Sequence, residues 1–78
     1  MQNTQDRKPQ IVEISEDHIE LCQLIKFAGL SESGGEVKLA IIDGLVKVNG
    51  AIETRKRKKI FNGDIVEFNG YSLTIKTL

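Results

Sequence analysis

Two of the three Asn-Gly dipeptides in this 78-residue chain constrain its fold more than any other feature; the third, at residues 62–63, lies in a predicted turn. Each pair, at residues 49–50 and 69–70, lies between short segments rich in branched and aromatic residues. Asn and Gly tolerate the positive φ angles of a two-residue hairpin turn, so each pair predicts two antiparallel strands joined by a tight turn. The expected strands cover residues 45–49, 51–54, 64–68 and 71–76, with a turn at 61–64 between the hairpins.

A first helix is predicted over residues 17–28. Asp17 and Glu20 have the spacing of a capping box, in which two side chains satisfy backbone donors that the first helical turn leaves free. The apolar residues that follow recur on one helical face, at Leu21, Leu24, Ile25 and Ala28. Gly29 should end this helix. Ahead of it, residues 11–14 have the composition of a short strand, and residues 1–10 are predicted to form a flexible tail.

A second helix is predicted over residues 33–43. Ser33 and Glu36 repeat the capping-box spacing, and Gly44 can adopt the left-handed conformation that closes a helix. The expected buried stripe comprises Val37, Ala40 and Ile41, widened by Leu39 and Ile42. The chain is therefore predicted to be an α+β protein with a tail at 1–10 and a single domain at 11–78. In that domain two short N-terminal helices pack on a small, mostly antiparallel sheet.

The net charge of zero conceals a segregation of charge along the chain. Residues 1–37 carry seven acidic and three basic residues, whereas residues 38–59 carry seven basic and two acidic ones. The second segment predicts a cationic patch, which is typical of proteins that bind anionic partners.

Composition argues against several other classes of protein. Cys22 is the one cysteine, so the sequence indicates neither an internal disulfide nor a cysteine-based metal site. The longest apolar stretches are far shorter than a membrane span, and the first residues lack a signal-peptide pattern. We expect a cytoplasmic protein, with a monomer favoured, that uses no cofactor or metal and contacts no membrane.

The run Arg55-Lys56-Arg57-Lys58-Lys59 is the sharpest candidate for a functional site. Five adjacent like charges repel each other unless an anion neutralises them. Phosphate suits them, because arginine can hold it through two parallel N–H bonds and lysine contacts it as a point charge. Lys47 on the preceding strand and Lys38 in the adjoining helix could extend the same face. The alternative is a solvated loop that keeps a sheet edge soluble.

The aromatic residues fall at apolar-periodic or turn positions and are predicted to lie in the core: Phe27, Phe61, Phe68 and Tyr71. Stacking of bases on an aromatic platform is therefore disfavoured. The expected ligand is a folded RNA backbone that is recognised by its shape.

A catalytic constellation is not indicated. His18 and Cys22 are four residues apart on the predicted first helix, but the sequence supplies no partner that would orient them as base and nucleophile. We interpret His18 as a first-turn helix residue and Cys22 as a partly buried one. We therefore predict that the protein is not an enzyme.

Four segments resemble a known family when they are taken in order. They are residues 28–31 (Ala-Gly-Leu-Ser), 33–38 (Ser-Gly-Gly-Glu-Val-Lys), 43–50 (Asp-Gly-Leu-Val-Lys-Val-Asn-Gly) and 62–68 (Asn-Gly-Asp-Ile-Val-Glu-Phe). Together they resemble the S-four-like RNA-binding domain, the alpha-L motif of a small-subunit ribosomal protein, over residues 19–68. The similarity is greatest to the short, stand-alone bacterial type, in which no catalytic domain is attached.

The resemblance implies that the second helix and the adjoining loop and strand bind RNA. This assigns RNA contacts to Ser33, Lys38, Lys47, Arg55, Lys56, Arg57, Lys58 and Lys59. Ser33 is sufficiently explained as a helix cap and therefore ranks below the cations as an RNA contact. Many members of the family have arginine where this chain has Glu20 and Gly34, which shifts the expected RNA face toward the hairpin and the cationic run.

The predicted function is non-catalytic binding of structured RNA, with ribosomal or transfer RNA as the candidate targets. The alternative is a protein-interaction adaptor whose cationic loop docks an acidic partner. The two differ because only the first predicts an association that ribonuclease abolishes.

Overall fold

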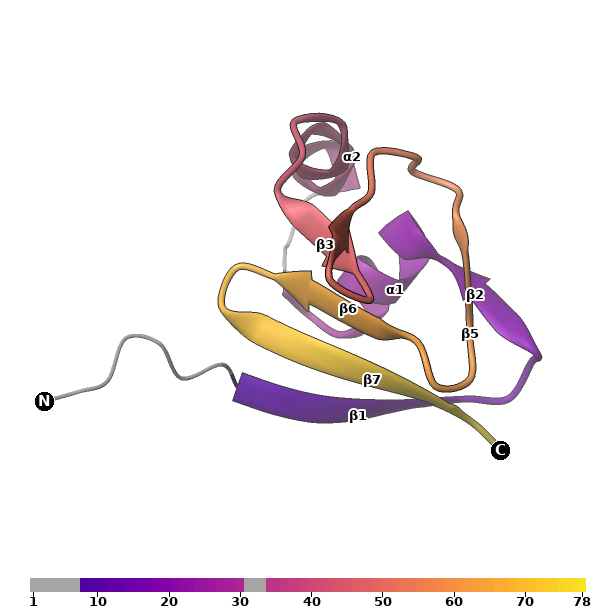
Figure 1. Cartoon of the computed structure of the whole chain (residues 1–78). Coiled ribbons are helices and arrows are strands. Elements are labelled where there is room, and N and C mark those ends of the chain that lie inside the picture. Colours follow the sequence, from indigo (N-terminus) through magenta and orange to yellow (C-terminus); the bar gives the residue numbers. More distant parts are fainter. Residues whose placement is uncertain (1–7, 31–33) are drawn as a thin grey trace, which may run out of the picture.

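A computed structural model describes residues 8–30 and 34–78 of the chain. The described residues form two helices, a five-stranded sheet in the order β1-β7-β6-β3-β4 and a separate two-stranded ribbon of β2 and β5 (Figure 1). The elements are β1 (Lys8–Ile14), β2 (His18–Glu20), α1 (Leu21–Phe27), α2 (Gly34–Ile42), β3 (Val46–Val48), β4 (Ala51–Ile52), β5 (Lys59–Phe61), β6 (Ile65–Phe68) and β7 (Tyr71–Thr77). The α+β class and the mostly antiparallel sheet are as predicted.

Both predicted hairpins are confirmed. β3 pairs antiparallel with β4 through Asn49-Gly50, and β6 pairs with β7 through Asn69-Gly70. The φ angles are 53° and 87° in the first turn and 54° and 83° in the second, so all four turn residues adopt the left-handed conformation that Asn and Gly accept most readily. The turn at 61–64 is also present, closed by a 3.0 Å bond from the Asp64 N–H to the Phe61 carbonyl.

The N-terminal boundary of the fold differs from the prediction. β1 begins at Lys8, and its residues pair in parallel with β7 from Lys8↔Tyr71 to Ile14↔Thr77. Residues 8–10 are therefore part of the sheet and not of a tail, and residues 1–7 of the predicted tail lie outside the described residues. The strand predicted at residues 11–14 is present as part of β1. Because β1 and β2 precede both helices, the N-terminal position predicted for the helices is not confirmed (Figure 1).

The start of the first helix was also predicted too early. Residues 18–20 form β2 and pair with β5, and α1 begins at Leu21. Glu20 occupies the N-cap position without a side-chain capping bond, so the proposed Asp17–Glu20 capping box does not form. Pairing with a distant strand has replaced the local helical start, and His18 is consequently a strand residue.

Both helices end at the predicted glycines. The N–H groups of Gly29 and Leu30 donate to the carbonyls of Lys26 and Ile25, and those of Gly44 and Leu45 donate to Ile41 and Ala40. These two hydrogen bonds at each helix end, with φ of 75° at Gly29 and 81° at Gly44, form the Schellman motif, which satisfies free carbonyls at the end of a helix. The capping residue predicted for the second helix, Ser33, lies outside the described residues.

The core lies between the helix pair and the inner face of the sheet. Alternate strand residues and one face of each helix supply it: Val12, Ile14, Leu21, Leu24, Ile25, Val37, Ile41, Val46, Val48, Ile60, Val66, Leu73 and Ile75. The predicted stripe on α2 is narrower than expected, because Leu39 is 62% exposed and Ile42 is 52% exposed. These two side chains remain available at the surface.

Candidate nucleic-acid interface

The cationic run 55–59 connects β4 to β5, and its backbone is fastened to the first turn of α1. The carbonyls of Lys56 and Lys58 accept hydrogen bonds from the N–H groups of Cys22 and Leu21, at 3.1 and 2.9 Å. These N–H groups belong to the start of a helix, which has no carbonyl of its own to offer them. The loop therefore caps the helix while the helix fixes the path of the loop.

Arg55 is held by a carboxylate two residues before it. Its Nε donates to Oε2 of Glu53 at 2.8 Å, its Nη2 donates to Oε1 at 3.2 Å, and its backbone N–H donates to Oε2 at 3.0 Å. The Glu53 side chain is 14% exposed and the Arg55 side chain 70% exposed. The side-chain hydrogen bonds from Arg55 lower the pKa of Glu53 from 4.5 to about 2, and the same contact raises the pKa of Arg55.

Arg57 contacts a carboxylate from the other side of the ribbon. Its Nε lies 3.4 Å from Oε2 of Glu20, and its side chain is 81% exposed. Glu20 is also the register partner of Lys59 across β2 and β5. At this exposure solvent screens the pair strongly, so Arg57 can exchange its carboxylate for another anion at little cost.

Four of the cations surround one depression of about 460 Å³, lined by Arg55, Arg57, Lys58, Lys59 and Phe61. Phe61 is 45% exposed, so its predicted place in the core is wrong. The same holds for Phe27, at 65% exposed, whereas Phe68 and Tyr71 are half-buried and pack against the core as predicted. The structure thus places an aromatic side chain among the cations, which sequence reasoning had missed. The alternation of β5, with Ile60 inward and its neighbours outward, was the available signal.

The remaining predicted site residues are dispersed. Lys38 is exposed on α2 and Lys47 is exposed on β3, where it lies between Glu67 and Ile52 in the sheet register. Neither lines the cationic depression, and neither does Lys56, which is half-buried. Ser33 is outside the described residues. The structure therefore brings together half of the predicted set.

The Asn-Gly and Gly-Asp signatures have a structural role. The Asn49 side chain accepts a hydrogen bond from the Ile65 N–H at 2.9 Å and donates to Asp64 at 3.1 Å. Asp64 in turn accepts a bond from the Phe61 N–H at 2.8 Å. These contacts join the first hairpin, the 61–64 turn and the start of β6.

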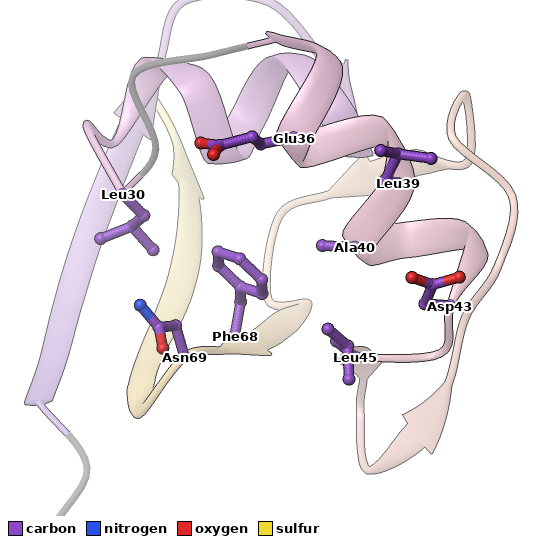
Figure 2. Close-up of a pocket in the computed structure, with 8 residues that line it drawn as sticks. All are labelled: Leu30, Glu36, Leu39, Ala40, Asp43, Leu45, Phe68 and Asn69. Carbon is purple, nitrogen blue, oxygen red and sulfur yellow. The ribbon is translucent and has the colours of Figure 1, made fainter.

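A second depression lies between α2 and the end of the β6–β7 hairpin (Figure 2). Its apolar lining is Leu30, Leu39, Ala40, Leu45 and Phe68, and its polar residues are Glu36, Asp43 and Asn69. It shares no residue with the cationic depression. Two carboxylates and no cation at this surface make it a poor match for the phosphates of a nucleic acid.

Other candidate chemistry is sparse within the described ranges. The Nδ1 of His18 lies 2.8 Å from Oδ1 of Asp17 at the surface, and Cys22 is a half-buried free thiol. Among residues 8–30 and 34–78, no group of three acidic, His or Cys side chains could hold a metal ion. No helix in the same part of the chain has the length and apolar character needed to cross a membrane.

The fold and the site define a small α+β module in which a cationic loop is hydrogen-bonded to the first turn of α1 beside a five-stranded sheet. Comparison with known proteins identifies the family to which this module belongs. The S4 domain model matches residues 12–76, and the chain belongs to the S4 domain family.

Relatives of known sequence or structure cover most of the chain. YbcJ of Escherichia coli strain K12 is 55% identical over 58 residues, which span 74% of this chain and 83% of YbcJ. The solution structure of YbcJ, described as revealing an alpha-L motif involved in RNA binding, has a TM-score of 0.66 and 44% identity, covering 97% of this chain and 91% of YbcJ. The probable ribosome maturation protein RlbA of Bacillus subtilis strain 168 is 33% identical over 60 residues, 77% of this chain and 84% of RlbA.

Proposed function

We propose that this chain binds structured RNA through the cationic depression and performs no catalytic step. One observation carries the proposal: four cations line one depression, and the loop that supplies them is hydrogen-bonded to α1. The cations are Arg55, Arg57, Lys58 and Lys59. A fixed backbone reduces the ordering that binding would otherwise require, and clustered cations release counterions from a phosphate chain.

The relatives support RNA as the anion. The YbcJ structure is described with a motif involved in RNA binding, and RlbA is named for ribosome maturation. Ribosomal RNA is therefore the first candidate and transfer RNA the second. Lys38 and Lys47 are proposed as outlying phosphate contacts, which a long RNA helix could reach beyond the depression.

A protein adaptor is the second candidate, because Arg55 and Arg57 already engage carboxylates within the chain. The same guanidinium groups could hold carboxylates of an acidic partner. Co-purification from cells before and after ribonuclease treatment separates the two functions. Loss of the associated material after treatment supports RNA, whereas an acidic protein that stays bound favours the adaptor.

Purified protein gives the sharper test. Lys58→Gln with Lys59→Gln removes two charges from the depression, and Lys26→Gln with Lys76→Gln removes two exposed charges that do not line it. With a structured RNA fragment, the first pair should flatten the dependence of log affinity on log salt by up to about two units, and the second should change it far less. Equal effects of the two pairs would refute the proposed face.

A further inference from the structure

Phe61 presents a half-exposed phenyl ring within the cationic depression. Ile60 before it is fully buried, and Lys59 and Phe61 lie on the outward face of β5. Phe61 is one of several large apolar side chains that are exposed, and of these it is the one that lines the cationic depression. Its place among four cations, and not its exposure alone, points to a ligand.

The Phe61 ring has an aromatic neighbour, and the Phe61 backbone is held by hydrogen bonds. Its register partner on β2 is His18, whose ring centroid lies 5.7 Å from that of Phe61 at an interplanar angle of 43°. The Phe61 N–H donates to the Asp64 carboxylate at 2.8 Å, and its carbonyl accepts the Asp64 N–H at 3.0 Å. The ring therefore stands on a paired strand with a fixed backbone.

The depression around the ring combines two kinds of contact. Phe61 and the aliphatic stems of the basic side chains offer apolar surface, and the same side chains bring positive charge to the site. The depression has a volume of about 460 Å³ and is open to solvent. One nucleotide matches this combination, because its base has an apolar π-face and its phosphate is an anion.

We propose that Phe61 is a stacking platform for one unpaired nucleobase, whose flanking phosphates are held by Arg57 and Lys59. The inference rests on the proposed function and adds to it the feature that the RNA must present: a nucleotide that is bulged or looped out beside a helix. Aromatic stacking tolerates any base, so the site selects an unpaired nucleotide and not a sequence.

Two RNA duplexes test the inference, each formed by two strands without a loop and identical except that one carries a single bulged nucleotide. At low salt, the unmodified protein should bind the bulged duplex about tenfold more tightly. Phe61→Leu should lose about that factor on the bulged duplex and leave the fully paired duplex unchanged, whereas Phe61→Tyr should retain the preference. Phe27→Leu is the matched control, because Phe27 is 65% exposed on α1 and does not line the depression.

A fluorescent 2-aminopurine at the bulge reports stacking directly. Its emission should be quenched by the unmodified protein and by Phe61→Tyr, and much less by Phe61→Leu, with thermal melting used to confirm that each variant is folded. Equal losses on both duplexes, or no loss with Phe61→Leu, would overturn the stacking role and leave RNA binding intact. Binding of neither duplex by the unmodified protein would overturn the proposed function itself.

Discussion

Replacing Glu53 with glutamine should strengthen RNA binding at low salt, because it releases Arg55 from its ion pair. Glu53 now contacts the Arg55 guanidinium at 2.8 and 3.2 Å and is only 14% exposed. Of the four cations that line the depression, Arg55 is thus the one whose charge is most fully compensated. A phosphate must compete with this carboxylate for the same donors.

The size of the effect follows from counterion release. Each phosphate neutralised contributes about 0.9 to the slope of log affinity against log salt, so a released Arg55 should make the slope steeper by about one unit. Lowering salt from about 200 to about 50 mM would then increase affinity about fourfold more for Glu53→Gln than for the unmodified protein.

Fluorescence anisotropy with a labelled RNA hairpin over that range of salt measures both slopes. Glu13→Gln is the matched control, because it removes an exposed carboxylate on β1, outside the depression. Thermal melting establishes that both variants are folded at the assay temperature. A slope that stays unchanged in folded Glu53→Gln would refute the competition. A flatter slope would refute it too, and would show that Glu53 positions Arg55 for phosphate.

Three further predictions concern stability. The pKa of Glu53 is lowered from 4.5 to about 2, so ionised Glu53 stabilises the fold above pH 4.5 and this stabilisation is lost as the pH falls toward 2. The melting temperatures of the unmodified protein and Glu53→Gln should therefore converge across that interval. Asn49→Gly keeps the turn conformation but deletes the two side-chain bonds, and should lower the free energy of unfolding by about 1–2 kcal/mol in urea titrations, against little change for Asn69→Gly. Gly44→Ala should lower it by about 1 kcal/mol, since φ is 81° and the added carbon would lie at an ordinary 3.5 Å from Ile52. A larger loss for Asn69→Gly than for Asn49→Gly, or an unchanged Gly44→Ala, would contradict these assignments.

Features set by neighbouring residues could be predicted from the sequence. The Asn-Gly turns, the helix ends at Gly29 and Gly44, and the alternation of Val46 and Val48 each depend on backbone preferences within a few residues. The position of the cationic run next to a hairpin was also readable, because the run directly follows the predicted strand.

The site itself needed the fold. Arg57 meets Glu20 across 37 positions of sequence, and the exposure of Phe61 depends on the pairing of β5 with β2. In the sequence, Phe61 was assigned to the core, because residues 59–61 were not predicted to form a strand and the alternation of β5 was not recognised. Glu20 likewise became visible as the partner of Arg57 only with the three-dimensional structure.

The sequence alone determined the hairpins, the glycine helix ends and the concentration of charge, because these are local properties of the chain. The tertiary structure decided that β1 pairs in parallel with β7, that α1 starts at Leu21, and which cations share a depression. Backbone donors and acceptors in an isolated segment can be satisfied in several ways. At residues 18–20 the capping-box pattern favoured a helix, and the distant strand β5 supplied hydrogen-bond partners that made β2 the outcome.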